Sequence, residues 1–230
     1  MNKEAIILAG GFGTRLKDTV PDLPKCLAPV KGQPLLYYII TYLLDSGVDK
    51  IIFSLFYKSE LVIKYIKDEF SFINYEFVIE ESALGTGGAL ALALNKAKKD
   101  NVVVVNGDSI FKIDLDNLFL FHNEKNASFS IGLKKMINPI RYGTVTMQES
   151  GKILNFNEKD QFIRDGIING GVYIINKNIF LQNLNLSTFS LETDYLMIDT
   201  VNKNIYGKIF ENYFIDIGIP ADYLKANLEL

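Results

Sequence analysis

Short apolar runs alternate with longer amphipathic stretches in the first half of the chain. The runs have the length, and the bounding glycines and polar residues, of buried strands. Four consecutive valines at 102–105 suit a strand that is buried on both faces. Four strands are therefore predicted, at residues 5–8, 51–55, 75–79 and 102–105.

The stretches between these runs predict three helices. Pro34 suits the first turn of the first helix, and Gly47 suits its end. The other two are predicted at residues 58–70 and 86–98, and the second carries lysines in its last turn, where the helix dipole favours cations. A repeated strand–helix–strand order indicates a parallel sheet with right-handed crossovers. The predicted fold is therefore a doubly wound α/β fold. The apolar stripe of the first helix consists of Leu35, Leu36, Ile39, Ile40, Leu43 and Leu44.

The second half carries strand-like runs separated by turn residues. They predict mixed or antiparallel strands added to the same, mostly parallel sheet. A helix near residues 192–203, a strand pair around 206–216 and a final helix from Pro220 complete the chain. No linker-like or repetitive segment interrupts it, so residues 1–230 are expected to form a single domain, with halves at about 1–115 and 116–230. The added strands are predicted at 129–133, 143–148, 152–157 and 168–175.

Composition narrows the possible chemistry. The net charge is −3 with acidic and basic residues intermixed, which argues against a nucleic-acid surface or a polybasic membrane patch. Cys26 and His122 are the only cysteine and histidine, which excludes an internal disulfide, a Cys/His zinc cluster and most histidine-based triads. A metal ion would need oxygen ligands. Because no signal-peptide core and no apolar run of roughly 18 residues is present, a cytoplasmic location is expected.

Glycines, a hydroxyl and two cations cluster after the first predicted strand, in the segment Gly10-Gly11-Phe12-Gly13-Thr14-Arg15 and at Lys25. Backbone N–H groups in such a loop can approach a phosphate closely, and the cations would balance its charge. The segment lacks the Gly-Lys-Ser/Thr ending of a Walker loop. It also lacks the third glycine of a dinucleotide fingerprint, because Leu16 stands there. A tight turn without a ligand is the alternative.

The wider string resembles the signature of the sugar-1-phosphate nucleotidylyltransferases. It consists of Gly10-Gly11-x-Gly13-Thr14-Arg15-Leu16, Thr19 and Pro24-Lys25-x-Leu27-x-Pro29. The resemblance implies that the loop wraps a nucleoside triphosphate, and that Arg15 and Lys25 are catalytic because they stabilise charge at the reacting phosphates. The nucleotide-binding residues implied in this region are Leu8, Ala9, Gly10, Gly11, Gly13, Thr14, Arg15 and Lys25.

Two aspartates match the metal-binding elements of that family. Asp108 follows the valine run through a glycine, which would deliver it to the carboxyl edge of the sheet. Asp216 begins the segment Asp216-Ile217-Gly218-Ile219-Pro220, which matches an Asp-x-Gly-x-Pro element. The resemblance implies that Asp108 and Asp216 bind Mg²⁺ and are catalytic, with Asp108 also in contact with the nucleotide. A simple turn at Asp108 and a helix cap at Asp216 are the alternatives.

The segment Leu84-Gly85-Thr86-Gly87-Gly88 looks like the family's nucleobase-binding element, which implies nucleotide contacts for Gly85 and Thr86. Glu80 aligns with the position that reads the base in relatives. Guanine presents N1–H and N2–H₂ side by side, and a carboxylate can accept both, whereas uracil and thymine offer a single ring N–H between carbonyls. Glu80 therefore favours GTP. Glu81 is the competing candidate, and an exposed charge is the alternative for whichever of the two faces solvent.

The second half matches the sugar-phosphate elements of the family, in order. These are Tyr142-Gly143, Asn157-Glu158-Lys159 and Asn169-Gly170-Gly171-Val172-Tyr173. The resemblance implies that Gly143 and Asn169 contact the sugar, that Glu158 binds its hydroxyls and that Lys159 meets its phosphate. Asp160 departs from the proline that often follows Glu-Lys in relatives.

The implied reaction is the attack of a sugar 1-phosphate oxygen on the α-phosphorus of a nucleoside triphosphate, with release of pyrophosphate. Its nucleophile is already an anion, so a chain nearly devoid of histidine can catalyse it through positioning and charge neutralisation. The compact length, the Leu-Gly-Thr-Gly-Gly segment and the Phe-Ile-Asp-Ile-Gly-Ile-Pro ending are most similar to bacterial D-glycero-α-D-manno-heptose 1-phosphate guanylyltransferases. The implied partners are therefore GTP and heptose 1-phosphate, with the GDP-heptose product serving surface polysaccharides.

Other readings remain open at this stage. A mannose-1-phosphate guanylyltransferase, or a uridylyl- or thymidylyltransferase, would share most of these motifs. A catalytically silent regulatory subunit is less compatible with the sequence, because Arg15, Lys25, Asp108 and Asp216 are all present. The sequence leaves the oligomeric state open, a homodimer included, and does not define the sugar.

Overall fold

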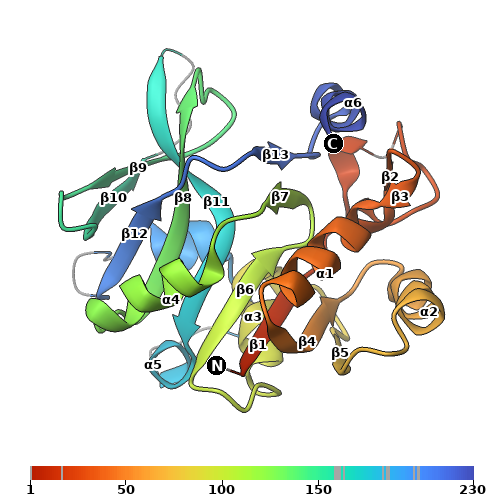
Figure 1. The fold of residues 1–230 in the computed structure, drawn as a ribbon, viewed down its shortest axis with the longest axis horizontal. Helices are drawn as coiled ribbons and strands as arrows, with labels where there is room; N and C mark the ends of the chain where they lie inside the picture. The colour runs from red at the N-terminus through yellow and green to blue at the C-terminus, as the bar shows by residue number, and fades with distance from the viewer. Residues whose placement is uncertain are drawn as a thin grey trace.

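The computed structural model describes residues 2–16, 18–157, 162, 164–182, 184, 187–198, 200 and 203–230. Within these residues the chain forms a nine-stranded sheet with helices on both faces (Figure 1). The sheet combines strands from both halves of the sequence, in the order β10-β9-β11-β6-β1-β4-β5, with β8 paired to β11 and β12 paired to β8. The α/β architecture with a mostly parallel, mixed sheet confirms the predicted fold class. No helix in the described part of the chain combines the length and the apolar character that a membrane crossing needs.

The parallel part of the sheet forms where the alternating pattern predicted it. Strand β1 pairs in parallel with β4 on one side and β6 on the other, and β4 pairs in parallel with β5. The first helix begins after Pro34 and is followed by Gly47, which has a φ of 73°. The elements of this part are β1 (Lys3–Leu8), α1 (Leu35–Asp45), β4 (Val48–Leu55), α2 (Ser59–Glu69), β5 (Tyr75–Ile79), α3 (Gly85–Leu94) and β6 (Asn101–Asn106).

Successive residues of the central strands enter two different cores. Ile7 and Val103 join a cluster packed under α1, α2 and α4 (Leu115–Glu124), whereas Ile6 and Val104 join a cluster packed under α3 and α5 (Lys177–Gln182). The four valines at 102–105 are at most 3% exposed. Side chains of one strand thus alternate between two helical layers. The central strands, and the loops that follow them, are therefore fixed by a hydrophobic core on each face of the sheet.

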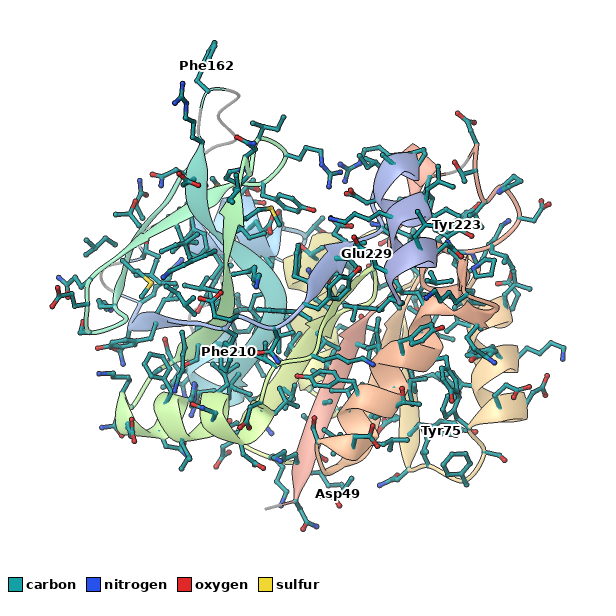
Figure 2. All side chains as sticks on the ribbon, turned by 45° about the horizontal axis from the view of Figure 1, so that its top comes forward. Asp49, Tyr75, Phe162, Phe210, Tyr223 and Glu229 are labelled. Carbon is teal, nitrogen blue, oxygen red and sulfur yellow. The ribbon has the colours of Figure 1, made fainter. Side chains whose placement is uncertain are left out.

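The second half adds antiparallel strands, as predicted. Strand β11 (Asp165–Asn176) pairs antiparallel with β6, β8 (Phe129–Ile137) and β9 (Thr144–Met147), and β9 pairs antiparallel with β10 (Ile153–Asn157). The tip of this region carries Phe162, whose side chain points away from the body of the molecule (Figure 2). The register of β11 shifts between Asn169 and Val172, so that Gly170 and Gly171 form a bulge.

Three sequence-based predictions were wrong in detail. Helix α3 ends at Leu94, so the lysines at 96, 98 and 99 follow the helix and do not occupy its last turn. In the described part of the region where a helix was predicted, near 192–203, the helical structure is the short π-helical segment Leu191–Leu196. The strands at 205–209 and 214–216 do not pair with each other, because each finds a partner far away in sequence. Strand β12 (Ile205–Ile209) pairs with β8, and β13 (Phe214–Asp216) pairs with β7 (Ser109–Phe111).

The C-terminal helix α6 (Pro220–Glu229) packs against a small ribbon made of β2 (Pro29–Val30) and β3 (Gln33–Pro34) (Figure 1). The hydroxyl of Tyr223, labelled on this helix in Figure 2, donates to the Pro29 carbonyl at 2.6 Å. The Lys31 N–H donates to Asn227 Oδ1 at 2.9 Å. The C-terminal helix is therefore joined to the segment that follows Lys25.

The only histidine of the chain, His122, is buried between α4 and β8. Its Nδ1 lies 2.9 Å from Ser130 Oγ, and burial lowers its pKa to about 4. Unfolding returns the ring to water, where its pKa is about 6.5, so the unfolded chain binds the proton more tightly. The stabilising effect of a neutral His122 is complete above pH 6.5 and is lost as the pH falls towards 4.

We therefore expect wild-type protein to lose about 3 kcal/mol of unfolding free energy between pH 6.5 and 4 through this group alone. Urea titrations at several pH values would measure the loss, with His122→Gln as the variant that cannot titrate. The difference between the two proteins isolates His122 from the carboxylates that also titrate in this range. Parallel stability curves for the two proteins would contradict the prediction.

Candidate functional site

A cavity of about 550 Å³ opens at the carboxyl ends of the parallel strands. It is lined from both halves of the chain, by the loop after β1, the start of α3, the segments after β6 and β13, and the bulge in β11. Glu158 and Lys159 lie outside the described residues. Every other predicted site residue lines the cavity, namely Leu8, Ala9, Gly10, Gly11, Gly13, Thr14, Arg15, Lys25, Glu80, Gly85, Thr86, Asp108, Gly143, Asn169 and Asp216.

The glycine loop needs its glycines for two different reasons. Gly13 has a φ of 61°, a left-handed conformation in which a side chain is strained. Gly10 lies so close to its neighbours that a Cβ there would be 2.8 Å from Glu80 Oε1 and 3.2 Å from Phe56 Cβ. Gly11 has open space around its missing side chain. The loop therefore packs against the ends of β4 and β5 and leaves its outer side open to the cavity.

Lys25 lies between two carboxylates, one from the middle of the sequence and one from near its C-terminus. Its Nζ is 2.7 Å from Asp108 Oδ2 and 3.3 Å from Asp216 Oδ1, and its side chain is 10% exposed. Burial and the neighbouring Asp108 carboxylate raise the pKa of Asp216, while the Lys25 ammonium opposes that rise. Two carboxylates that would repel each other are thus held around one positive centre.

The short sheet of β7 and β13 brings these aspartates together. Asp216 is the register partner of Ser109, and the Ile217 N–H donates to the Asp108 carbonyl at 3.1 Å. Phe111 packs edge-to-face against Phe210, which is labelled near the centre of Figure 2, with ring centroids 6.5 Å apart. The Asp216 carboxylate does not cap helix α6, whose N-cap is Ile219. It instead accepts the Gly218 N–H at 2.6 Å, which orients it towards Lys25.

The two carboxylates have the chemistry that Mg²⁺ prefers. Asp108 and Asp216 present hard oxygen donors, and both reach the same cationic atom of Lys25, so one ion could contact both. Within the part of the chain that the structure describes, no third cysteine, histidine, aspartate or glutamate joins them. Magnesium commonly uses one or two carboxylates together with substrate phosphates and water. The donor set therefore fits an ion that arrives with a phosphate ligand.

Glu80 and Glu81 occupy different environments. Glu80 is buried at the end of β5 and lines the cavity, and its Oε2 accepts the Leu84 N–H at 2.9 Å. Burial raises the pKa of Glu80. Glu81 is exposed and does not line the cavity. Of the two candidates for reading the base, Glu80 is therefore the one in position.

The start of α3 is covered by a segment from the second half of the chain, residues 187–191, which we call the strap. The Phe189 carbonyl accepts the N–H groups of Gly87 at 3.0 Å and Gly88 at 3.4 Å, and the Phe189 N–H donates to the Leu84 carbonyl at 2.9 Å. A Cβ at Gly88 would lie 2.4 Å from the Ser187 carbonyl oxygen. These glycines are thus explained by the close approach of the strap as well as by a ligand.

The residues predicted to bind the sugar phosphate, Gly143 and Asn169, line the same cavity as the glycine loop. Gly143 approaches β10 so closely that a Cβ would lie 2.8 Å from the Asn157 carbonyl oxygen. The β11 bulge turns Asn169 into the cavity, and its Oδ1 accepts the Gly171 N–H at 2.9 Å. Arg141 forms an ion pair with Asp222 of α6 and donates to the Tyr142 hydroxyl at 2.9 Å.

Several cavity residues were not predicted as site residues from the sequence. Phe12 stands half-exposed at the rim, where its ring packs edge-to-face on Phe56 at 5.4 Å between centroids. Phe12 and Tyr142 lay inside motifs that had been recognised, so a signal was available for them. No sequence signal marked Glu192, because its place on the wall depends on the strap.

Similarity to known proteins agrees with this geometry. Residues 4–230 match the nucleotidyl transferase family. The chain belongs to that family. It is 44% identical to the D-glycero-alpha-D-manno-heptose 1-phosphate guanylyltransferase of Aneurinibacillus thermoaerophilus over 99% of this chain and 98% of that protein, and 42% identical to the enzyme of the same name from Campylobacter jejuni over 96% of each.

Solved structures that are similar to this chain share its fold. HddC from Yersinia pseudotuberculosis has a TM-score of 0.88 and 34% identity, covering 99% of both chains. The same protein complexed with GMP-PN has a TM-score of 0.86 and 33% identity, with the same coverage. The family resemblance that the motifs implied is thus confirmed over nearly the whole chain.

The strap makes the stability effect of Gly88→Ala opposite to that expected for an ordinary helix. Alanine in a helix interior is normally favoured over glycine by about 1 kcal/mol, yet the Ser187 carbonyl oxygen leaves no room for a Cβ. We expect Gly88→Ala to lower the unfolding free energy by about 1–3 kcal/mol, the usual cost of overpacking. Chemical denaturation measures this, and Gly11→Ala, where a Cβ meets open space, is the matched control. A stabilised Gly88→Ala protein would show that the strap does not press on α3.

Proposed function

We propose that this protein couples GTP with D-glycero-α-D-manno-heptose 1-phosphate to give GDP-heptose and pyrophosphate. The observation that carries the proposal is the Lys25, Asp108 and Asp216 cluster, which faces the glycine loop in one cavity shared by both halves of the chain. The sugar and the base follow from the 42–44% identical relatives, which are named for this activity and match over nearly their full length.

The chemistry requires positioning and charge neutralisation. A sugar 1-phosphate oxygen attacks the α-phosphorus of GTP, a new P–O bond forms, and the bond to the β,γ-diphosphate breaks to release pyrophosphate. Arg15 would hold the β- and γ-phosphates at the glycine loop, and Lys25 would stabilise the charge that develops at the α-phosphorus. The nucleophile is an anion, so no side chain has to accept a proton. His122, buried between α4 and β8, takes no part.

Asp108 and Asp216 would hold Mg²⁺. When bound, the ion would neutralise phosphate charge and relieve the repulsion between the carboxylates and the anionic substrate. The contribution of the chain is to keep both carboxylates aimed at one point, through the β7–β13 pairing and the Gly218 N–H. The same carboxylates hold the Lys25 ammonium in the cavity, within reach of a bound phosphate.

The rest of the predicted site divides between the two substrates. Leu8, Ala9, Gly10, Gly11, Gly13 and Thr14 would contact the triphosphate and the nucleoside, and Gly85 and Thr86 would contact the base from the start of α3. Gly143 and Asn169 would contact the sugar, with Glu158 on its hydroxyls and Lys159 on its phosphate. Residues 1–230 would act as one cytoplasmic nucleotidyltransferase domain, with a nucleotide half of about 1–115 and a sugar-phosphate half of about 116–230.

Mannose 1-phosphate is the second candidate sugar. A putative mannose-1-phosphate guanyltransferase from Sulfolobus acidocaldarius is 32% identical, although this chain spans only 62% of its length. Because the two sugars share the manno ring and differ in one carbon with its hydroxyl, a hydrophobic contact alone would separate them only modestly.

A matrix of four nucleoside triphosphates against heptose, mannose and glucose 1-phosphates tests the proposal. We expect Mg²⁺-dependent release of pyrophosphate that is fastest with GTP and heptose 1-phosphate. EDTA should abolish turnover, because the oxygen donors of the site need a divalent ion to meet the phosphates.

Asp108→Asn, which keeps the shape of the side chain and removes its charge, should reduce kcat by about 100-fold or more. Failure of every pair of substrates in the wild-type protein would favour a non-catalytic subunit of this fold.

Glu80 carries the prediction about the base. The carboxylate accepts two adjacent N–H donors of guanine, and a glutamine would place an NH₂ group against one of them. We expect Glu80→Gln to reduce the preference for GTP over UTP in kcat/KM by about 10- to 100-fold. Glu81→Gln, on the neighbouring exposed position, should leave that preference unchanged. An unaltered GTP/UTP ratio in Glu80→Gln would remove Glu80 from base recognition.

A further inference from the structure

Arg141 is a third cation of the cavity, in addition to Arg15 and Lys25. It lies in the segment between β8 and β9, and its side chain is 33% exposed. Among the described residues that line the cavity, these three are the ones with a cationic side chain. The reaction chemistry above uses Arg15 and Lys25 and gives Arg141 no role, although two phosphate-bearing substrates have to share the cavity.

Two partners hold the Arg141 guanidinium in place and leave part of it available. Its Nη2 forms an ion pair with the Asp222 carboxylate on α6 and donates to the Tyr142 hydroxyl at 2.9 Å. A guanidinium has five N–H donors, of which Nη2 carries two. The hydrogen bonds of this side chain to described residues both use Nη2. The three N–H groups on Nε and Nη1 are therefore available to a ligand that enters the cavity.

Arg141 is also less neutralised by the protein than Lys25 is. The Lys25 ammonium is shared by Asp108 and Asp216, so this cluster has one more carboxylate than cations. Arg141 contacts a single carboxylate, that of Asp222, which does not line the cavity. An anion that reaches the guanidinium thus meets no surplus negative charge there, and phosphate oxygens accept strong, charge-assisted hydrogen bonds from arginine.

The surroundings of Arg141 belong to both parts of the site that the attacking phosphate has to join. Gly143, two residues later, lines the cavity and is a proposed sugar contact. The ring of Tyr142 packs edge-to-face on Phe214, two residues before Asp216, at 5.9 Å between centroids. Burial raises the pKa of Tyr142 to about 12, and the nearby Asp216 charge adds to that rise. In a sugar 1-phosphate the phosphate lies between the sugar ring and the α-phosphorus that it attacks, which is the interval that these contacts span.

We propose that Arg141 binds the phosphate of the sugar 1-phosphate and holds its attacking oxygen in the cavity. The inference rests on the proposed function and deepens it, since it assigns a substrate contact to a residue that the motifs did not mark. Arg141 keeps its protons throughout, and the bonds that form and break are those of the reaction described above.

Steady-state kinetics with Arg141→Met and Arg141→Lys tests the proposal. We expect Arg141→Met to raise the KM for the sugar 1-phosphate by about 10- to 100-fold, the effect of losing hydrogen bonds between charged groups, while the KM for GTP stays within about twofold. Arg141→Lys keeps the charge but loses the planar set of donors, so its KM should fall between those of Arg141→Met and the wild-type protein.

Two inhibitors distinguish a phosphate contact from a structural role. Inorganic phosphate and the free sugar should both compete with the sugar 1-phosphate in the wild-type protein. We expect Arg141→Met to weaken inhibition by inorganic phosphate by about the same factor as it raises the KM, and to leave inhibition by the free sugar within about twofold. A purely structural role of Arg141 would weaken both inhibitors equally.

A second control addresses the ion pair to α6. Because the pair with Asp222 also joins this helix to the cavity, loosening of α6 is the competing explanation for a raised KM. Tyr223→Phe, at a position labelled in Figure 2, removes a different bond of the same helix, the one to the Pro29 carbonyl, and Tyr223 does not line the cavity. This variant should match the wild-type KM for the sugar 1-phosphate. Thermal denaturation checks folding, and Arg141→Lys carries the test if Arg141→Met does not fold.

Failure of this inference is distinguishable from failure of the proposed function. The role of Arg141 alone is overturned if the wild-type enzyme is active and one of three results appears. These are an unchanged KM for the sugar 1-phosphate in the Arg141 variants, equal weakening of both inhibitors, and a KM in Tyr223→Phe that rises as in Arg141→Met. A wild-type protein that turns over no pair of substrates overturns the proposed function, and the role of Arg141 with it.

Discussion

The Lys25 ammonium between Asp108 and Asp216 is the interaction on which the site depends. Both carboxylates contact the same Lys25 Nζ and are partly buried. Without the ammonium they would repel each other, and the repulsion is costly where water is scarce. The contacts link residues 83 and 191 positions apart in sequence. A positive charge between the aspartates is therefore a condition for bringing the first loop, the end of β6 and the C-terminal segment to one place.

The surrounding structure holds these three segments together. Strands β7 and β13 pair beside the aspartates, and α6 continues directly from β13 to pack on the β2–β3 ribbon that follows Lys25. Figure 1 shows α6, β13 and β7 along the same side of the molecule. Arg141, which lines the cavity, adds an ion pair to Asp222 on that helix. The C-terminal helix thus contacts the ribbon that follows Lys25 and the Arg141 side chain that lines the cavity.

The sequence predicted the parts of the fold whose signal is local. The run Val102 to Val105 predicted a strand buried on both faces. The structure has such a strand, because a helical layer covers each side of the sheet. The pairing of β7 with β13 could not be predicted, because each strand has three residues and partners more than 100 positions away. Helix α4 did carry a signal that was not used, since Asp114 caps it and Leu115, Leu118 and Phe119 follow at helical spacing.

The residues of the candidate site also differ in whether a local sequence signal marks them. Residues in contiguous motifs, such as Arg15 and Lys25, could be placed from the sequence, because the loop that carries them begins at the end of a predicted strand. Glu192 could not, because its position requires Phe189 to lie against Gly87, and nothing local to either residue indicates the other. The overlong helix predicted at 86–98 had a similar cause, since helical periodicity continues past Leu94 whereas the backbone does not.

The strap also changes the interpretation of the glycines at the start of α3. From the sequence they indicated a cradle for the nucleobase, yet a Cβ at Gly85 or Gly88 would meet a backbone oxygen of the strap at 2.4 Å. Thr86 lines the cavity while its Oγ1 accepts the Leu191 N–H. One short segment therefore contacts the start of α3 and fixes the backbone next to Glu192 on the cavity wall. Because densely packed backbone transmits displacement, we expect the cavity wall at Glu192 to move together with the start of α3, to which the strap is hydrogen-bonded.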